Sequence, residues 1–239
     1  MRQNKITILS TRSLNDELIG EAIAKGISID VIPFIQTQPI HSIEVQQEIE
    51  QALMRTAVVV FTSVNAVEAA AAEMKDHSPD WQIFCIGQAT YQSIEKYFGT
   101  DLISGAADNA RDLANMIIDN SDADEVIFFC GDQRRNELPD ALRKNNIEVH
   151  EIIVYNTVAT PNMIEKKYDG ILFFSPSAVS SFFQNNQLDE QAILFAIGST
   201  TASEIKKFSK NKIVVSDVPD KKSLLEKLIS YFQSHPIHH

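Results

Sequence analysis

Two stretches of the chain, 112 positions apart, share one design. Residues 61–70 read FTSVNAVEAA and residues 173–182 read FFSPSAVSSF, so each joins an apolar, strand-like run to a helix-forming run through small polar residues. A second matching pair follows these corners at nearly the same distance, with IGQATYQSI starting at Ile86 and IGSTTASEI at Ile197. Two strand-to-helix corners repeated in the same order predict two related domains.

A third match ties the ends of the two copies together. Residues 9–34 resemble residues 129–154, so this strand–helix–strand unit opens one copy and closes the other. We therefore predict one discontinuous domain from residues 1–35 and 159–239, and a second domain from residues 39–154. The linkers fall at about 36–38 and 155–158, and a ligand cleft is expected between two hinged domains.

Short β-branched or aromatic runs alternate with helical patterns along nearly the whole chain. This alternation is typical of an α/β fold with mainly parallel sheets. The predicted strands are ITILS, SIDVIPF, AVVVFT, QIFCIG, DLIS, EVIFFC, EVHEIIVY, GILFFS, ILFAIG and KIVVS.

The charge balance limits the classes of partner. The net charge is −11, from 32 acidic and 21 basic residues, which argues against nucleic acid or an anionic membrane as a partner. No apolar run approaches the ~20 residues that span a bilayer, and no signal-peptide core is present, so a cytoplasmic location is expected. Cys85 and Cys130 lie in apolar runs typical of buried thiols, and no metal-ligand cluster is visible.

The repeated corners fall where ligands bind in parallel sheets, beyond the carboxyl ends of the strands. Helix N-termini there offer unpaired N–H groups and a partial positive charge, which can hold carboxylates or phosphates. Thr62, Ser63 and Asn65 in the first corner, with Ser175 and Ser177 in the second, either donate to a ligand or serve as ordinary helix caps.

Five further residues are candidates on position. Gly87 lets the backbone approach closely, and Thr90 and Thr201 follow the glycines of the two IG motifs by three residues; capping is again the alternative. Tyr155 ends the run EIIVY, either facing the cleft or lying half-buried as an aromatic residue. Arg12 follows the first strand and could bind a carboxylate bidentately, or it is an ordinary surface arginine.

In order along the chain, the sequence contains FTSVNAV, IGQAT, GDQRRNELPDAL followed by EVHEIIVYNT, FFSPSAVSSF and AIGSTTASEI. With these motifs the sequence resembles the uroporphyrinogen-III synthases over about residues 6–232. The resemblance implies two flavodoxin-like α/β domains joined by a two-stranded linker, with the ligand cleft between them. It also implies a lyase without cofactor that closes hydroxymethylbilane to uroporphyrinogen III in haem biosynthesis, inverting the terminal pyrrole ring and releasing water.

The resemblance assigns roles to residues of this chain. Tyr155, in the VYNT motif, becomes the candidate catalytic residue, a general acid that assists departure of the substrate hydroxyl. The loop GDQRRN lacks a glycine–arginine pairing of the family, which disfavours Arg134 and Arg135 as ligands. The family positions of the two IG motifs and the two corners fall on Thr90, Thr201, Ser63, Ser175 and Ser177. Together with Arg12, Thr62, Asn65, Gly87 and Ala178, they are the substrate-binding candidates.

The expected partner is the linear tetrapyrrole substrate. We expect a monomer, with at most a transient contact with the upstream bilane-forming enzyme. The alternative function is a non-catalytic cytoplasmic protein that binds or senses a small molecule, because hinged α/β domains also serve as receptors. A signalling receiver domain would need an acidic cluster beside the first strand, whereas STRSLND follows it here.

Overall fold

The computed structural model describes residues 6–73 and 78–235, and the chain divides into two compact units. Unit 1 comprises Met1–Gln36 and Val158–His239, and unit 2 comprises Thr37–Thr157. The first predicted domain also takes in residues 1–5 and 236–239, which lie outside the described residues.

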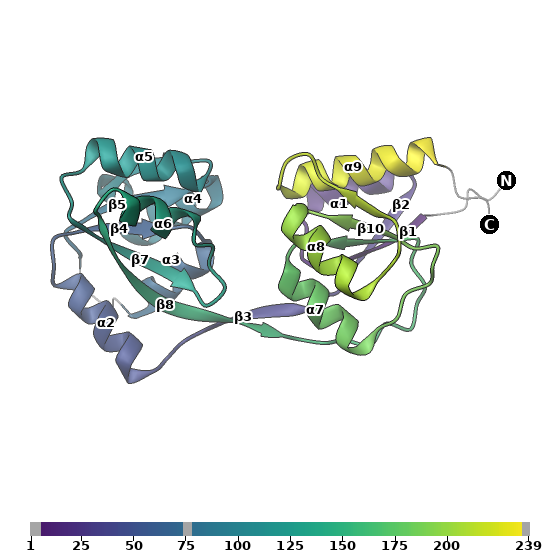
Figure 1. Ribbon diagram of the computed structural model, residues 1–239, viewed down its shortest axis with the longest axis horizontal. Coiled ribbons are helices and arrows are strands. Elements are labelled where there is room, and N and C mark those ends of the chain that lie inside the picture. The colour runs from purple at the N-terminus through teal and green to yellow at the C-terminus, as the bar shows by residue number, and fades with distance from the viewer. Residues whose placement is uncertain (1–5, 74–77, 236–239) are drawn as a thin grey trace. The chain divides into compact units, whose positions relative to one another are not determined.

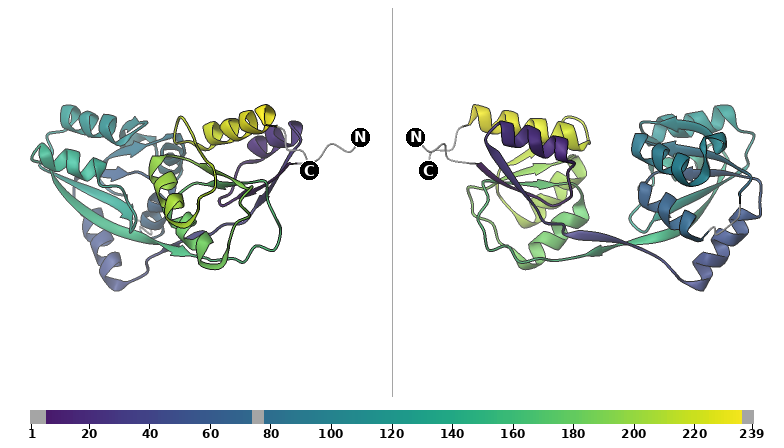
Figure 2. Two further views of the ribbon diagram at one scale, coloured as in Figure 1. Left: turned by 45° about the vertical axis from the view of Figure 1, so that its right-hand side comes forward. Right: turned by 180° about the vertical axis from the view of Figure 1, so that it is seen from behind.

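Unit 1 is a five-stranded sheet in the order β11-β10-β9-β1-β2, with every neighbouring pair parallel. Helices α1 and α9 cover one face of the sheet and α7 and α8 cover the other (Figure 1). The helices α1 and α9 lie side by side although almost 200 residues separate them (Figure 2). The elements are β1 Ile6–Ser10, α1 Asp16–Ala24, β2 Ile27–Val31, β9 Gly170–Phe173, α7 Pro176–Asn185, β10 Ile193–Ala196, α8 Ser199–Phe208, β11 Ile213–Val215 and α9 Lys221–Ser234.

Unit 2 is a six-stranded sheet in the order β3-β8-β7-β4-β5-β6. Helices α2, α3 and α4 pack on one face, and α5 and α6 on the other. The elements are β3 Ile35–Pro39, α2 Ile43–Leu53, β4 Ala57–Phe61, α3 Val64–Glu73, β5 Trp81–Ile86, α4 Gln88–Phe98, the 3-10 helix η1 Thr100–Leu102, β6 Ile103–Ala107, α5 Ala110–Asn120, β7 Glu125–Gly131, α6 Glu137–Lys144 and β8 Glu148–Ala159.

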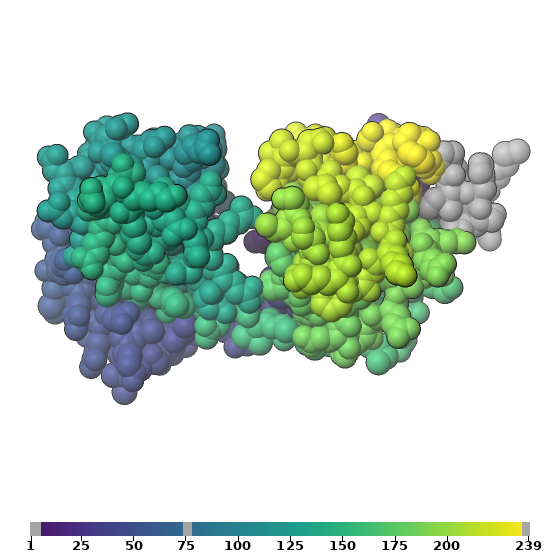
Figure 3. All heavy atoms as spheres, in the orientation of Figure 1, coloured from purple at the N-terminus to yellow at the C-terminus, as the bar shows by residue number. Residues whose placement is uncertain are grey.

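The core explains why the strands of both units are so apolar. The central strand β4 reads AVVVF and is buried on both faces, as expected of a parallel strand between two helix layers. Each of the four core clusters draws its residues from one unit alone. In the space-filling view, the late segments α8 and α9 form much of the visible surface of unit 1 (Figure 3).

The predicted α/β fold with parallel sheets is confirmed, and the strands lie close to the predicted ranges. The strand predicted at DLIS is wrong at its first two residues, because Thr100–Leu102 form η1 and β6 begins at Ile103. Both cysteines are buried, and burial raises the pKa of Cys85 to about 11 and of Cys130 to about 12. Among the described residues, no helix combines the length and hydrophobicity needed to cross a membrane.

Candidate functional site

The predicted binding residues of unit 2 follow the neighbouring strands β4 and β5, and Tyr155 lies within β8, which pairs with β7 beside β4. Because these strands are parallel, their carboxyl ends lie at one edge of the sheet, where the helices that follow them begin. In unit 1, the site residues follow the neighbouring strands β10, β9 and β1 in the same way. Each unit therefore places its candidates at the carboxyl edge of its own sheet.

The corner between β4 and α3 is built around Ser63. Its hydroxyl oxygen accepts the N–H of Ala66 at 3.3 Å, so it caps α3, and it lies 3.2 Å from the phenolic oxygen of Tyr155. Thr62 and Asn65 are half-buried, and within the described residues neither side chain makes a hydrogen bond. Ser63 is thus a cap that also contacts Tyr155, while Thr62 and Asn65 keep free hydrogen-bonding groups.

The corresponding corner between β9 and α7 has the same construction. The hydroxyl oxygen of Ser175 accepts the N–H of Ala178 at 3.2 Å, and Pro176 occupies the first helical turn, where its missing N–H is tolerated. The hydroxyls of Ser175 and Ser177 lie 3.1 Å apart. The repeat predicted from sequence therefore extends to the hydrogen bonds of the two corners.

The two IG motifs start their helices differently. Gly87 precedes α4 with φ of 83°, a conformation that favours glycine, whereas Gly198 precedes α8 in an extended conformation with φ of −170°. No side chain caps either helix. Helix α6 also lacks a side-chain cap, whereas side chains cap α1, α2, α3, α5, α7 and α9 in the described part of the chain. The first N–H groups of α4 and α8 are therefore available to an anionic ligand.

Thr90 and Thr201 lie in the first turn of these helices and are buried, with exposed fractions of 4% and 1%. Within the described part of the chain, neither side chain makes a hydrogen bond, so the capping interpretation is wrong for both. Helix α4 packs on α3, and α8 packs on α7. A small side chain at each position suits these close contacts.

Tyr155 lies within β8 and is half-buried against the core cluster that also holds Val154. Its ring covers Gly131, the last residue of β7, and its hydroxyl contacts Ser63. Tyr155 and the first corner are thus in direct contact within unit 2. The sequence predicted Tyr155 and Ser63 as site residues, but it did not predict the contact between Tyr155 and Gly131.

Arg12 follows β1 at the carboxyl edge of unit 1 and is exposed. Its guanidinium makes no hydrogen bond or ion pair with any described residue. Beside it, Lys221 at the start of α9 donates to the carbonyl of Ser13 at 3.0 Å. Burial, and then the charge of Arg12, lower the pKa of Lys221. Sequence reasoning missed Lys221, and the only signal was a lysine directly after the helix cap Asp220.

Arg134, in the loop after β7, is bound to a carboxylate of its own unit. Its Nε donates to Glu151 on β8, and Nη2 of Arg143 donates to the same carboxylate at 2.8 Å. Burial alone would raise the pKa of Glu151, but the hydrogen bonds from Arg134 and Arg143 outweigh it and lower that pKa. Arg134 therefore holds the loop against β8.

Replacing Glu151 by glutamine should lower the free energy of unfolding by about 1 kcal/mol at pH 7, because two guanidinium groups lose their charged partner. A carboxylate with a lowered folded pKa stabilises the protein above its unfolded pKa of about 4.3, and this contribution is lost as the pH falls. The difference between wild type and Glu151→Gln should therefore shrink below about pH 4 in urea unfolding. Glu148→Gln, at an exposed position of the same strand, is the control. A difference that stays constant down to pH 3 would contradict the prediction.

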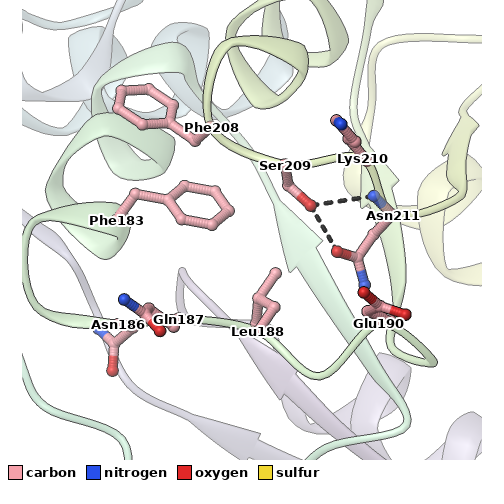
Figure 4. A pocket seen from close by; sticks show the side chains of 9 residues that line it. All are labelled: Phe183, Asn186, Gln187, Leu188, Glu190, Phe208, Ser209, Lys210 and Asn211. Atoms are coloured by element: carbon pink, nitrogen blue, oxygen red, sulfur yellow. Dashed lines mark hydrogen bonds between the residues drawn. The ribbon is translucent and has the colours of Figure 1, made fainter.

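A cavity of about 670 Å³ lies at the other ends of α7 and α8, away from the corners. Phe183 and Phe208 stack in it with ring centroids 5.2 Å apart (Figure 4). The side-chain amide groups of Asn186 and Asn211 are used to bind the main chain of neighbouring loops. This cavity is therefore not the candidate site. Among the described residues, no group of three or more His, Cys, Asp or Glu could hold a metal ion.

A family model described as uroporphyrinogen-III synthase HemD matches residues 16–226. The chain belongs to the uroporphyrinogen-III synthase family. The uroporphyrinogen-III synthase of Saccharomyces cerevisiae (strain ATCC 204508 / S288c) is 27% identical over 179 residues, which is 64% of this chain and 65% of the yeast enzyme. Membership of this family, whose enzymes are lyases of tetrapyrrole biosynthesis, confirms the resemblance seen in the motifs.

Solved uroporphyrinogen-III synthases share the fold. The uroporphyrinogen-III synthetase of Helicobacter pylori 26695 is similar with a TM-score of 0.65 and 14% identity, over 95% of this chain and 99% of that one. A mutant uroporphyrinogen III synthase of the extremely thermophilic bacterium Thermus thermophilus gives a TM-score of 0.62 and 12% identity, over 96% and 98% of the two chains. These similarities confirm the two-domain α/β fold.

Proposed function

We propose that this chain closes hydroxymethylbilane to uroporphyrinogen III, with inversion of the terminal pyrrole ring. The observation that carries the proposal is the repeated carboxyl edge: each unit presents a serine-capped corner beside a helix that no side chain caps. The corner residues 62–65 and 174–177 and the helix starts 87–90 and 198–201 contain no carboxylate. An acidic protein can therefore receive a substrate with eight carboxylates there.

Each of these contacts is expected to be weak. A carboxylate at a helix N-terminus is stabilised by about 0.3–1 kcal/mol at an exposed site. One such contact cannot hold the substrate, whereas several used together, with hydroxyls and Arg12, could. Eight carboxylates on one flexible molecule suit this kind of distributed binding.

In the reaction, the bilane hydroxyl departs as water and leaves an electrophilic azafulvene. The substituted carbon of the terminal pyrrole attacks it to form a spiro intermediate, and fragmentation and reclosure give the inverted ring. The pyrroles supply most of this reactivity, so the protein acts chiefly by orienting the chain of four rings. No cofactor takes part in this scheme.

Tyr155 is the proposed general acid. Its hydroxyl lies 3.2 Å from Ser63, the cap of α3, so it is held beside a helix N-terminus that favours negative charge. Transfer of its proton to the departing hydroxyl would be assisted there. We also propose that the protein is a monomer and that it makes at most a transient contact with the upstream bilane-forming enzyme.

The test is to supply freshly made hydroxymethylbilane and to separate the oxidised products by isomer. We expect the type III isomer in excess, formed faster than the type I isomer forms spontaneously. A heat-denatured sample of the chain is the control. Only the type I isomer, at the rate of that control, would overturn the proposal, and tight binding without turnover would instead favour the sensing protein.

A further inference from the structure

The pairing of β7 with β8 changes register beside Tyr155. Cys130 pairs with Ile153, but the next residue, Gly131, pairs with Tyr155, so Val154 is an extra residue on β8. Successive side chains of a regular strand point to opposite faces. Here Val154 and Tyr155 both contact the same core cluster, because the bulge turns Tyr155 to the face of α3.

Gly131 leaves room for the tyrosine ring. A Cβ atom at this position would overlap the Cε2 and Cζ atoms of Tyr155 and would come within 2.8 Å of its phenolic oxygen. The glycine is needed for space rather than for its backbone conformation, since the positive-φ glycines of the described residues are Gly26, Gly87 and Gly99. The ring therefore rests directly on the main chain of β7.

Asp132 fixes the main chain of β8 on both sides of Asn156. Its N–H donates to the carbonyl of Tyr155 at 3.1 Å, and its Oδ1 accepts the N–H of Thr157 at 2.8 Å. The same loop is held a second time by Arg134, whose guanidinium binds Glu151 on β8. The main chain of Tyr155 is thus held from the loop after β7.

We propose that Gly131 and Asp132 are positioning residues that set the place of the Tyr155 hydroxyl. Gly131 fixes where the ring lies, and Asp132 fixes the strand that carries it, so the hydroxyl points to Ser63 rather than out with the exposed Ile153. The proposal rests on the proposed function, because only that function gives the hydroxyl of Tyr155 a role as general acid. It adds two residues that contact Tyr155 and need not contact the substrate.

The first test compares Asp132→Ala with Asp132→Asn. Asparagine keeps the Oδ1 acceptor for Thr157 and should restore most of the turnover, while alanine should lower kcat about 10-fold with little change in KM. Gln133→Ala is the control, because Gln133 is exposed in the same loop and its side chain makes no hydrogen bond to a described residue. Equal losses in Asp132→Asn and Asp132→Ala would overturn the role of Asp132.

The second test uses Gly131→Ala, which should lower kcat about 30-fold by displacing the ring. In the Tyr155→Phe background it should cause no further loss of kcat, whereas a loss that simply adds would overturn the role of Gly131. If Gly131→Ala does not fold, the Asp132 pair still decides the proposal.

A spectroscopic measurement separates this proposal from the proposed function. In protein labelled with 3-fluorotyrosine, the fluorine resonance of Tyr155 is identified by its loss in Tyr155→Phe. It should shift in Gly131→Ala and Asp132→Ala but not in Asp132→Asn. A shift with unchanged turnover would leave the positioning intact and overturn the acid role, while an unchanged resonance in both variants would overturn the positioning.

Discussion

Replacing Tyr155 by phenylalanine should lower the turnover of hydroxymethylbilane about 100-fold, at the lower end of the range for loss of a general acid. The ring keeps its place over Gly131, so only the hydroxyl and its contact with Ser63 are removed. That contact is worth about 1 kcal/mol or less, so the protein should remain folded. Single-turnover measurement of the type III isomer gives the rate of the chemical step directly.

The matched control for this change is Tyr168→Phe. Tyr168 also has a hydrogen-bonded hydroxyl, which donates to Asp30 at 2.9 Å, but it lies before β9, away from the carboxyl edge. Burial, and then the carboxylate of Asp30, raise its pKa to about 12. Tyr168→Phe should leave turnover within about twofold of wild type. Full single-turnover activity in Tyr155→Phe would remove the acid role and leave orientation alone.

The strands and corners were predictable because their determinants are local. AVVVF and ILFA can be buried on both faces only in a parallel sheet covered by helices, and serine before a helix is a strong cap signal. From the sequence, Ser63 is either a helix cap or a residue that donates to a ligand. The structure shows that its oxygen accepts from Ala66 and contacts Tyr155 at once.

The rest depends on contacts between residues far apart in sequence. Nothing in EIIVYNT marks Val154 as the extra residue of a bulge, because the register is set by pairing with β7. Gly131 looks like a turn glycine until the ring of Tyr155 is placed against it. Lys221 becomes a neighbour of Arg12 only because α9 returns to the side of α1. Val154, Gly131 and Lys221 belong to no sequence motif that would have predicted these contacts.

Phe129→Ala should lower the free energy of unfolding of unit 2 by about 3–5 kcal/mol. Phe129 is fully buried on the central strand β7, and its ring stacks on Phe61 at 5.2 Å and lies 5.6 Å from Trp81. Alanine would leave a cavity between rings that cannot collapse, since strands on both sides fix their positions. Phe129→Leu should cost much less, because it fills most of that volume.

The sole tryptophan makes this effect measurable in one unit. Trp81 is buried in the same cluster as Phe129, so its fluorescence reports the unfolding of unit 2. With a urea dependence of about 2 kcal/mol per M, the midpoint should fall by about 2 M. Phe195→Ala is the matched control, because this fully buried ring packs on Phe232 in a cluster confined to unit 1. If the two cores unfold separately, Phe195→Ala should shift the unfolding transition seen by far-UV circular dichroism much more than the transition seen by Trp81 fluorescence. Equal shifts of the Trp81 midpoint in both variants would mean that the two cores unfold as one cooperative unit.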